Sequence, residues 1–200
     1  MTAVTKNMKF NRGLKHTPVK LENFEYPKVN WKYASAKWVL SHAESTNNTL
    51  RDIILQCPIV GNHKRILLDV KVQDLVPSKT SCIAGWHLDG PESPLHDSNP
   101  EIHHLYIHEE GGETEFISDE LDLEVNDSMS QKDIVNMIPD GVNITKSMAG
   151  CFTTFTRFDF HRGINVKKPM RRLLVRLTET DVILPRNKPY LHAVGTVDNV

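Results

Sequence analysis

The chain has 200 residues, of which 39% are hydrophobic and 24% are charged, and its formal net charge is −1. This length fits one domain with a substantial core, and the near-neutral charge argues against a protein whose main task is to coat nucleic acid. No apolar run is long enough to cross a bilayer, no signal-peptide pattern follows Met1, and Cys57, Cys82 and Cys151 form no CxxC pair. We therefore expect a cytoplasmic protein with buried, reduced thiols.

The first third of the chain is predicted to be an arm followed by helices. Residues 1–23 lack periodicity and are rich in lysine, which predicts a solvated arm; contact with an anionic partner is the alternative. Residues 31–40 are apolar and prone to form a helix. A second short helix is expected from about residue 50 to 56, with Thr49 as its cap and Pro58 beyond its end.

From Arg65 onward, short strands are expected between loops rich in Pro, Gly, Asp and Asn. Branched and aromatic residues place these strands at 66–72, 81–88, 102–108, 114–117, 151–158 and 172–178. The clear helix of this half is expected at 130–138, where Ser130 is the cap, Asp133 completes a capping-box-like pair and Pro139 ends the helix. This order predicts a mainly β fold with flanking helices, such as a β-barrel or jelly roll.

His87, Asp89 and His161 are the side chains that best suit a metal site. Residues two apart in a strand point the same way, so His87 and Asp89 can converge on one point beside the loop that follows them. Two imidazoles and one carboxylate can hold one face of a ferrous ion and leave the other for a chelating cosubstrate and O₂. Each part also has an alternative without a metal: His87 and Asp89 could be a surface pair, and His161 could be a histidine bonded to the backbone at a strand end.

A second histidine group, His103, His104 and His108, offers an alternative metal site. In a strand, His104, Tyr106 and His108 would share a face, and a zinc site there is conceivable. No carboxylate or fourth ligand stands at a recognised spacing, however, and the glutamate of an HExxH helix is missing. The pattern therefore favours the first group.

Arg172 and Arg176 share one side of the last predicted strand, and Leu173, Val175 and Leu177 share the other. Periodicity alone favours an apolar face turned inward and two arginines in water. In a barrel both faces are covered, and the arginines would point into the cavity. Buried guanidinium groups need anionic partners, and a dicarboxylate that spans the iron and Arg172 would satisfy that need.

Four segments together resemble the Fe(II)/2-oxoglutarate-dependent dioxygenases, especially the branch of taurine dioxygenase and clavaminate synthase. They are Gly85-Trp86-His87-Leu88-Asp89, Gly111-Gly112-Glu113-Thr114, Phe160-His161-Arg162-Gly163 and Arg171-Arg172-Leu173-Leu174-Val175-Arg176. The likeness covers roughly residues 66–180. It implies a single domain with an arm and supporting helices at 1–64, a double-stranded β-helix (jelly-roll, cupin-like) core at 65–180 and a C-terminal extension at 181–200. His87 and His161 are 161 − 87 = 74 positions apart, so the large insertion that helps shape the substrate pocket of taurine dioxygenase is nearly absent.

The resemblance also assigns roles to the site residues. It implies that His87, Asp89 and His161 ligate Fe(II), and that Thr114 and Arg172 hold the distal carboxylate of 2-oxoglutarate. Arg176, one same-face step further along, could bind the cosubstrate or an anionic substrate. The implied reaction uses O₂ to hydroxylate a C–H bond of a polar or anionic substrate, with release of succinate and CO₂.

The substrate is less well defined by the sequence. Asp97 and Asn99, in the loop at 91–100, and Arg162 are candidates for polar substrate contacts. Basic residues at 157–171, together with the basic arm, keep a nucleic-acid-modifying oxygenase as an alternative. A non-catalytic, cupin-like metal- or ligand-binding module is the other alternative, and it would not need the predicted cosubstrate residues.

Overall fold

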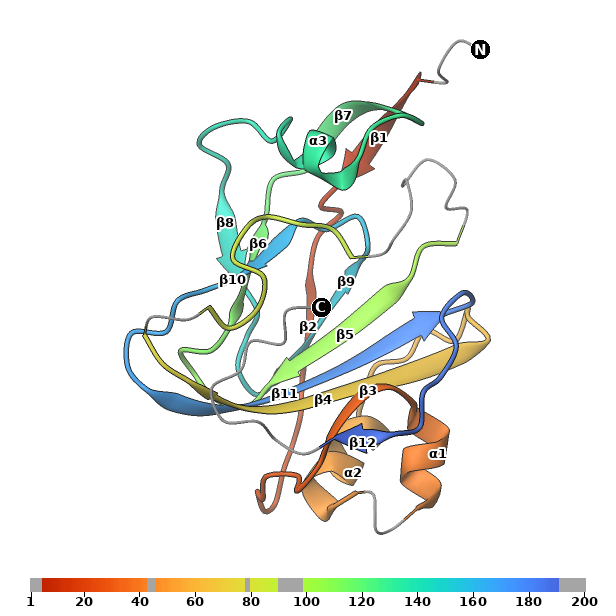
Figure 1. The fold of residues 1–200 in the computed structure, drawn as a ribbon, viewed down its shortest axis with the longest axis vertical. Coiled ribbons are helices and arrows are strands. Elements are labelled where there is room, and N and C mark those ends of the chain that lie inside the picture. Colours follow the sequence, from red (N-terminus) through yellow and green to blue (C-terminus); the bar gives the residue numbers. More distant parts are fainter. Residues whose placement is uncertain (1–4, 43–45, 78–79, 90–98, 191–200) are drawn as a thin grey trace.

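The computed structural model describes residues 5–42, 46–77, 80–89 and 99–190. Within these residues the protein is mainly β, with antiparallel strands in three sheets and a few short helices (Figure 1). This confirms the expected mainly β fold with flanking helices. No helix in these ranges is long and apolar enough to span a membrane.

A seven-stranded antiparallel sheet forms the centre of the structure. Its strands, in spatial order, are β12 (Pro189–Tyr190), β3 (Asn30–Ser35), β4 (Arg65–Leu75), β11 (Met170–Thr180), β5 (Ile102–Ile107), β9 (Cys151–Thr156) and β2 (Lys15–Pro18). The long strands β4 and β11 pair from Met170 opposite Leu75 to Thr180 opposite Arg65. This register fixes the positions of the β11 arginines along the sheet.

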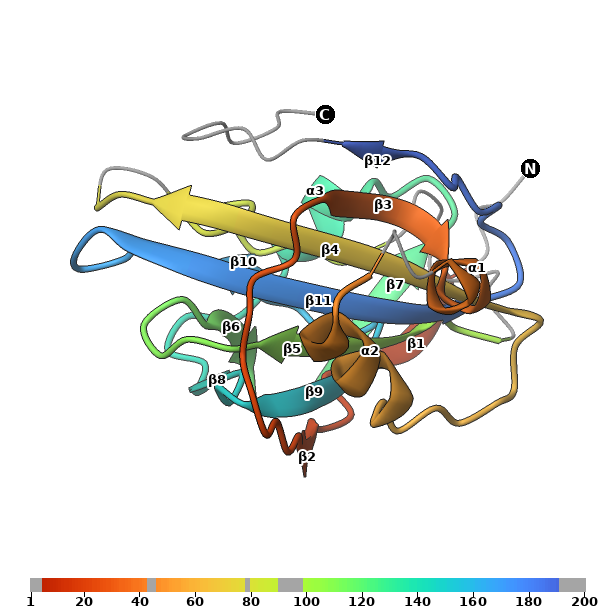
Figure 2. The same cartoon turned by 90° about the horizontal axis from the view of Figure 1, so that it is seen from below.

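One face of the large sheet is apolar and is covered by α1 (Ala36–Ser41) and α2 (Asn48–Leu55) (Figure 2). Val175 and Leu177 of β11 belong to the same buried cluster as the helix residues Val39 and Ile53. The predicted helix at 31–40 is wrong in its first half, which is strand β3, because those residues pair with β4. Helix α2 begins two residues earlier than expected, since Asn47 rather than Thr49 accepts the capping hydrogen bond.

The other face of the large sheet lies toward a three-stranded sheet made of β10 (His161–Gly163), β6 (Thr114–Ile117) and β8 (Ile144–Lys146) (Figure 1). Phe116 of β6 packs with Leu105, Ile107 and Phe155 of the large sheet. Both faces of β11 are therefore covered, and Arg172 is fully buried. Arg176 is partly buried and pairs with Asp69 and Asp89, so the expectation from periodicity alone, that both arginines lie in water, is wrong.

The N-terminal residues are more ordered than the predicted arm. Strand β1 (Thr5–Phe10) pairs with β7 (Leu121–Asn126), and β2 pairs with β9. Met8 and Phe10 are buried in an apolar cluster that includes Ile134 of α3 (Gln131–Val135). A solvated arm is therefore the wrong interpretation for residues 5–18, because alternate apolar side chains are buried and neighbouring strands satisfy the backbone. Helix α3 begins with the predicted capping box of Ser130 and Asp133.

The predicted strand at 81–88 does not form. Within this segment and its edges, isolated bridges join Thr80 to Asn165 and His87 to His161. Ile83 is 60% exposed, so the segment does not bury an alternating face as a strand of the core would. The segment instead runs beside β10 and presents His87 to it.

Candidate metal centre

His87 and His161 are placed side by side by their own backbone. The His87 amide donates to the His161 carbonyl at 3.0 Å, and the His161 amide donates to the His87 carbonyl at 3.1 Å. Directly opposed residues of an antiparallel pair project to the same side. Their ring centroids lie 4.2 Å apart. The distance between the imidazoles is therefore set by main-chain pairing.

Hydrogen bonds to backbone carbonyls select the same tautomer in both rings. Nδ1 of His87 lies 2.9 Å from the Gly85 carbonyl oxygen, and Nδ1 of His161 lies 3.0 Å from the Asp159 carbonyl oxygen. Burial lowers the His161 pKa, which favours its neutral ring, whereas burial of His87 is outweighed by hydrogen bonds to Cys82 and Gly85, which raise the His87 pKa. A carbonyl oxygen only accepts, so each Nδ1 carries a proton, and the lone pair of either ring in its neutral form lies on Nε2. This is the pattern by which metal-binding histidines are oriented in proteins.

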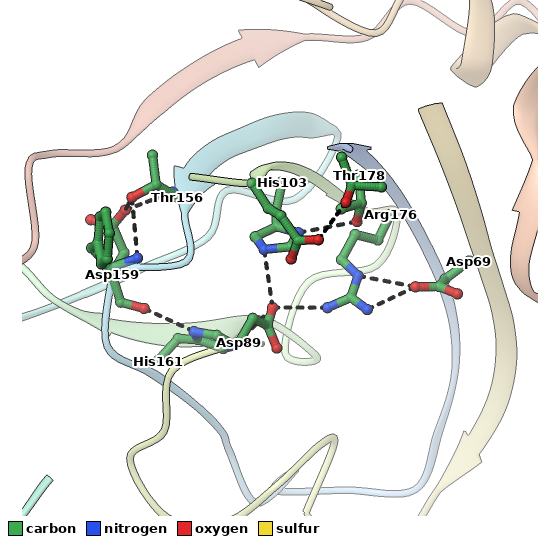
Figure 3. Close-up of polar contacts among 11 residues, drawn as sticks. Asp69, Asp89, His103, Thr156, Asp159, His161, Arg176 and Thr178 are labelled. Atoms are coloured by element: carbon green, nitrogen blue, oxygen red, sulfur yellow. Dashed lines mark hydrogen bonds and ion pairs between the residues drawn. The ribbon is translucent and has the colours of Figure 1, made fainter. Parts of the chain in front are cut away.

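Asp89 completes a group of three possible metal ligands. One ligand atom from each of His87, Asp89 and His161 lies within 4.8 Å of the others. Asp89 Oδ2 is 3.7 Å from His161 Nε2 (Figure 3). Burial favours the neutral carboxyl group, but the charge of Arg176 outweighs it and holds the Asp89 pKa well below its usual range. Asp89 is therefore an anion that can neutralise part of the charge of a cation.

Arg176 lies between two carboxylates. Its Nη1 donates to Asp89 Oδ2 at 3.0 Å, and its Nη2 donates to Asp69 Oδ2 at 2.7 Å (Figure 3). Asp69 Oδ1 in turn accepts from the Tyr33 amide at 2.7 Å, at an irregular position of β3 where Tyr33 has a φ of +53°. All three nitrogens of Arg176 thus face carboxylates, since Nε also donates to Asp69. A role of Arg176 in binding cosubstrate or an anionic substrate stays a prediction.

Arg172 has a different environment. Its guanidinium donates to the carbonyl oxygens of Gly112 and Ser81 and to the side-chain oxygen of Gln73. In the part of the chain that the structure describes, no carboxylate forms an ion pair with it, and its buried Nε has no hydrogen-bond partner. Burial lowers the Arg172 pKa to about 10, so the group remains a cation at neutral pH.

Two glycines allow these elements to approach. A Cβ on Gly163 would lie 2.4 Å from the Cys82 backbone nitrogen, so only glycine lets the 80–83 segment run against β10. A Cβ on Gly112 would lie 2.7 Å from Cδ of Arg172. These two motif glycines thus make room for the backbone at Cys82 and for the Arg172 side chain.

The remaining predicted site residues are dispersed. Thr114 is buried in β6, two residues after the carbonyl that Arg172 contacts, and its amide donates to Ser147 Oγ at 2.9 Å. Arg162 pairs with Glu115 and stacks on Trp86, which engages it away from the three ligands. Asn99 donates to Asp181 at 3.0 Å. Asp97 lies outside the described residues.

The second histidine group does not converge on one point. His104 and His103 are neighbours in β5, so their side chains point to opposite faces of the sheet. His104 bonds to Glu179, and His108 contacts Tyr106. Among the described residues, these histidines form no cluster that could hold a metal, so the alternative zinc site is not supported.

Sequence reasoning did not assign three residues to this site: it named neither Asp69 nor Cys82 as a site residue, and it grouped His103 with His104 and His108. His103 and Asp69 face the site from β5 and β4, and Cys82 makes a side-chain hydrogen bond with His87. Burial would raise the Cys82 pKa, but the hydrogen bond and the neighbouring cations lower it to about 7. Asp69 carried a signal in the sequence, because it is an acidic residue that directly follows Ile66, Leu67 and Leu68 and precedes Val70 in a predicted strand. Nothing in the sequence showed that His103 faces this site, because that depends on the register of β5 against β11.

A comparison of the chain with protein-family models, curated proteins and solved structures finds no match. Function is therefore inferred from the site itself.

Proposed function

We propose that the chain is an Fe(II)- and 2-oxoglutarate-dependent dioxygenase that hydroxylates a C–H bond of a small polar substrate. The observation that carries the proposal is the convergence of two Nε2 lone pairs and one carboxylate beside a buried arginine that has no anionic partner among the described residues. We propose with it that the two facing antiparallel sheets are the halves of a double-stranded β-helix.

The donor set fits a ferrous ion. Two neutral imidazoles and one carboxylate form the three-ligand set that leaves coordination positions open, whereas structural zinc sites use four protein ligands. In this assignment His87, Asp89 and His161 hold the iron. When bound, the iron and 2-oxoglutarate would supply the oxidising chemistry, with succinate and CO₂ as products.

Arg172 fits the far carboxylate of 2-oxoglutarate. A buried cation is costly without an anion, and the carbonyl oxygens around Arg172 satisfy hydrogen bonds without neutralising its charge. The Nε–H of Arg172, which has no partner among the described residues, could donate a charge-assisted hydrogen bond to a carboxylate. The Ser81 and Gly112 carbonyl groups accept from the same guanidinium, and the side chain of Cys82, the residue after Ser81, bonds to His87. The cosubstrate would therefore lie between Arg172 and His87.

The charges around the centre favour a small polar substrate over nucleic acid. Of the basic residues near the loop at 157–171, Arg157 is buried, Arg162 pairs with Glu115 and Arg171 pairs with Asp74. Lys167 and Lys168 are exposed in that loop. Two exposed lysines in this loop provide few positive charges for binding the phosphates of a nucleic acid.

An anaerobic titration tests the proposal. Fe(II) is added to the protein with and without 2-oxoglutarate, and the visible absorption is recorded. We expect a weak metal-to-ligand charge-transfer band only when both are present, and formation of succinate once O₂ is admitted. Tight metal binding without the band and without succinate would instead identify a non-catalytic binding module.

A further inference from the structure

His103 has a buried nitrogen that the rest of the described structure leaves without a partner. The side chain is 2% exposed and lies on the face of β5 that looks toward Asp89 and Arg176. Nδ1 of His103 is 3.0 Å from Thr178 Oγ1, whereas Nε2 has no hydrogen bond within the described ranges. Buried polar atoms are nearly always bonded, so an orphaned one calls for a missing interaction.

The group that faces this nitrogen is the Asp89 carboxylate. His103 Nε2 lies 3.6 Å from Asp89 Oδ2, the same oxygen that accepts from Arg176 at 3.0 Å (Figure 3). A separation of 3.6 Å is too long for a hydrogen bond, and a small shift of the carboxylate would correct it. A neutral imidazole has one N–H to place, on either Nδ1 or Nε2.

Thr178 can decide which His103 nitrogen carries that proton. If the Thr178 hydroxyl donates to Nδ1, the proton must be on Nε2, where it points at Asp89. The opposite arrangement would leave a lone pair on Nε2 facing a carboxylate, which is repulsive. The geometry therefore favours His103 as a donor.

We propose that His103 is a positioning residue of the metal centre, whose Nε2–H donates to the Asp89 carboxylate once the metal is bound. Together with Arg176 it would hold that carboxylate from two directions and fix its orientation toward the ion. The inference rests on the proposed function only in taking Asp89 as a metal ligand. His103 is not itself part of the group of three whose ligand atoms lie within 4.8 Å of one another.

Two substitutions at position 103 test this role with Co(II) as the probe. His103→Phe keeps an aromatic ring but removes the donor, and we expect the Co(II) dissociation constant to rise about 10- to 100-fold, as for other residues that orient metal ligands. His103→Gln places an amide N–H near the position of Nε2, and we expect it to restore most of the affinity.

The melting temperature of the metal-free protein separates positioning from a structural role. We expect His103→Phe to melt no lower than the wild type without metal, because it removes an unsatisfied buried nitrogen. Its Co(II)-induced rise in melting temperature should nevertheless shrink. A lower metal-free melting temperature together with unchanged Co(II) affinity would overturn the proposal.

Thr178 provides a second test if the His103 variants fold poorly. Thr178→Val removes the hydroxyl with little change in shape and should weaken Co(II) binding, whereas Thr178→Ser keeps the donor and should not. Equal affinities for the two variants would contradict the assigned proton position. His161→Ala serves as the reference: if it binds Co(II) like the wild type, the metal-site assignment fails; if binding is lost there but unchanged in His103→Phe, only the role of His103 fails.

Discussion

The two faces of the large sheet use histidine in opposite ways. On the face covered by the helices, Nε2 of His104 is 2.9 Å from Glu179 Oε1, and Nδ1 is 2.9 Å from Thr154 Oγ1. Glu179 also accepts from the amides of Val60 and Gly61, each at 2.7 Å. Every polar atom of this His104–Glu179 network has a partner in the protein.

On the face that looks toward the second sheet, the partners are incomplete. Nε2 of His103 and Nε of Arg172 are buried without hydrogen bonds in the described ranges. His103 and Arg172 are buried about as deeply as His104 and Glu179. Completeness of hydrogen bonding therefore distinguishes a structural polar cluster from one that is built for a ligand.

Asp89→Ala should have the largest effect. It removes a proposed ligand and its charge, so the Co(II) dissociation constant should rise by more than about 100-fold. This exceeds the effect expected from changing a residue that only orients a ligand. Isothermal titration calorimetry measures the loss. Asp69→Asn is the matched control, because it also removes a carboxylate from Arg176 but no ligand, and its effect should be smaller. Equal effects would contradict the assignment of Asp89 as a ligand.

Arg172→Leu should weaken 2-oxoglutarate binding about 10- to 100-fold, the equivalent of one charge-assisted hydrogen bond. Co(II) affinity should not change. A 2-oxo acid without the far carboxylate should bind wild type and variant equally, which isolates the contact with Arg172. Arg172→Lys, which keeps the charge, should lose less affinity. An equal loss for both 2-oxo acids would show that the substitution merely disrupts the pocket.

Glu179→Gln probes the closed network on the opposite face. The amide nitrogen of glutamine would face a backbone N–H that now donates to Glu179, so unfolding free energy should fall by about 1–3 kcal/mol. Co(II) affinity should stay the same. Chemical denaturation with and without metal measures both quantities, and a marked loss of metal affinity would remove the distinction between the faces.

The same network predicts a loss of stability in acid. Burial lowers the His104 pKa, and hydrogen bonds from His104, Val60 and Gly61 outweigh burial and lower the Glu179 pKa. A group whose pKa is lowered by folding stabilises above its unfolded pKa, and that contribution is lost as the pH falls toward the folded pKa. Wild-type stability should therefore decline below about pH 6.5 and again below about pH 4.5, and Glu179→Gln should flatten the second decline.

Arg162→Gln should have the smallest effect. Arg162 lies on the Trp86 ring, 4.2 Å from its centroid, and pairs with Glu115 on a partly exposed surface. Such contacts contribute about 0.5–1 kcal/mol, so stability should change little. Retained affinity for metal and for substrate would confirm that Arg162 lies outside the site, whereas lost substrate affinity would restore its predicted role.

The parts of the fold that the sequence predicted are those with a strong local signal. Strands β4, β5, β6, β9 and β11 are rich in branched or aromatic residues, and α3 has a capping box. Strand β1 was missed because its lysines resemble a solvated arm, and its pairing with β7 depends on residues more than a hundred positions away. Long-range pairing overrides local composition there.

The same reasoning applies to the site. The grouping of His87, Asp89 and His161 could be predicted because two of the three are close in sequence and the third lies in a recognisable motif. The pairing of Arg176 with Asp69 and Asp89 could not, since it depends on the register of β11 against β4. The position of His103 could not be predicted either, because the sequence alone does not show which face of the sheet each residue of a strand points to.

The reciprocal amide bonds between His87 and His161 have one more consequence. Because main-chain pairing sets the spacing of positions 87 and 161, the framework does not depend on which donor atoms it carries. A cysteine at either position would start from the same backbone separation, so the donor atoms of the proposed metal site could be changed without altering the backbone that spaces them.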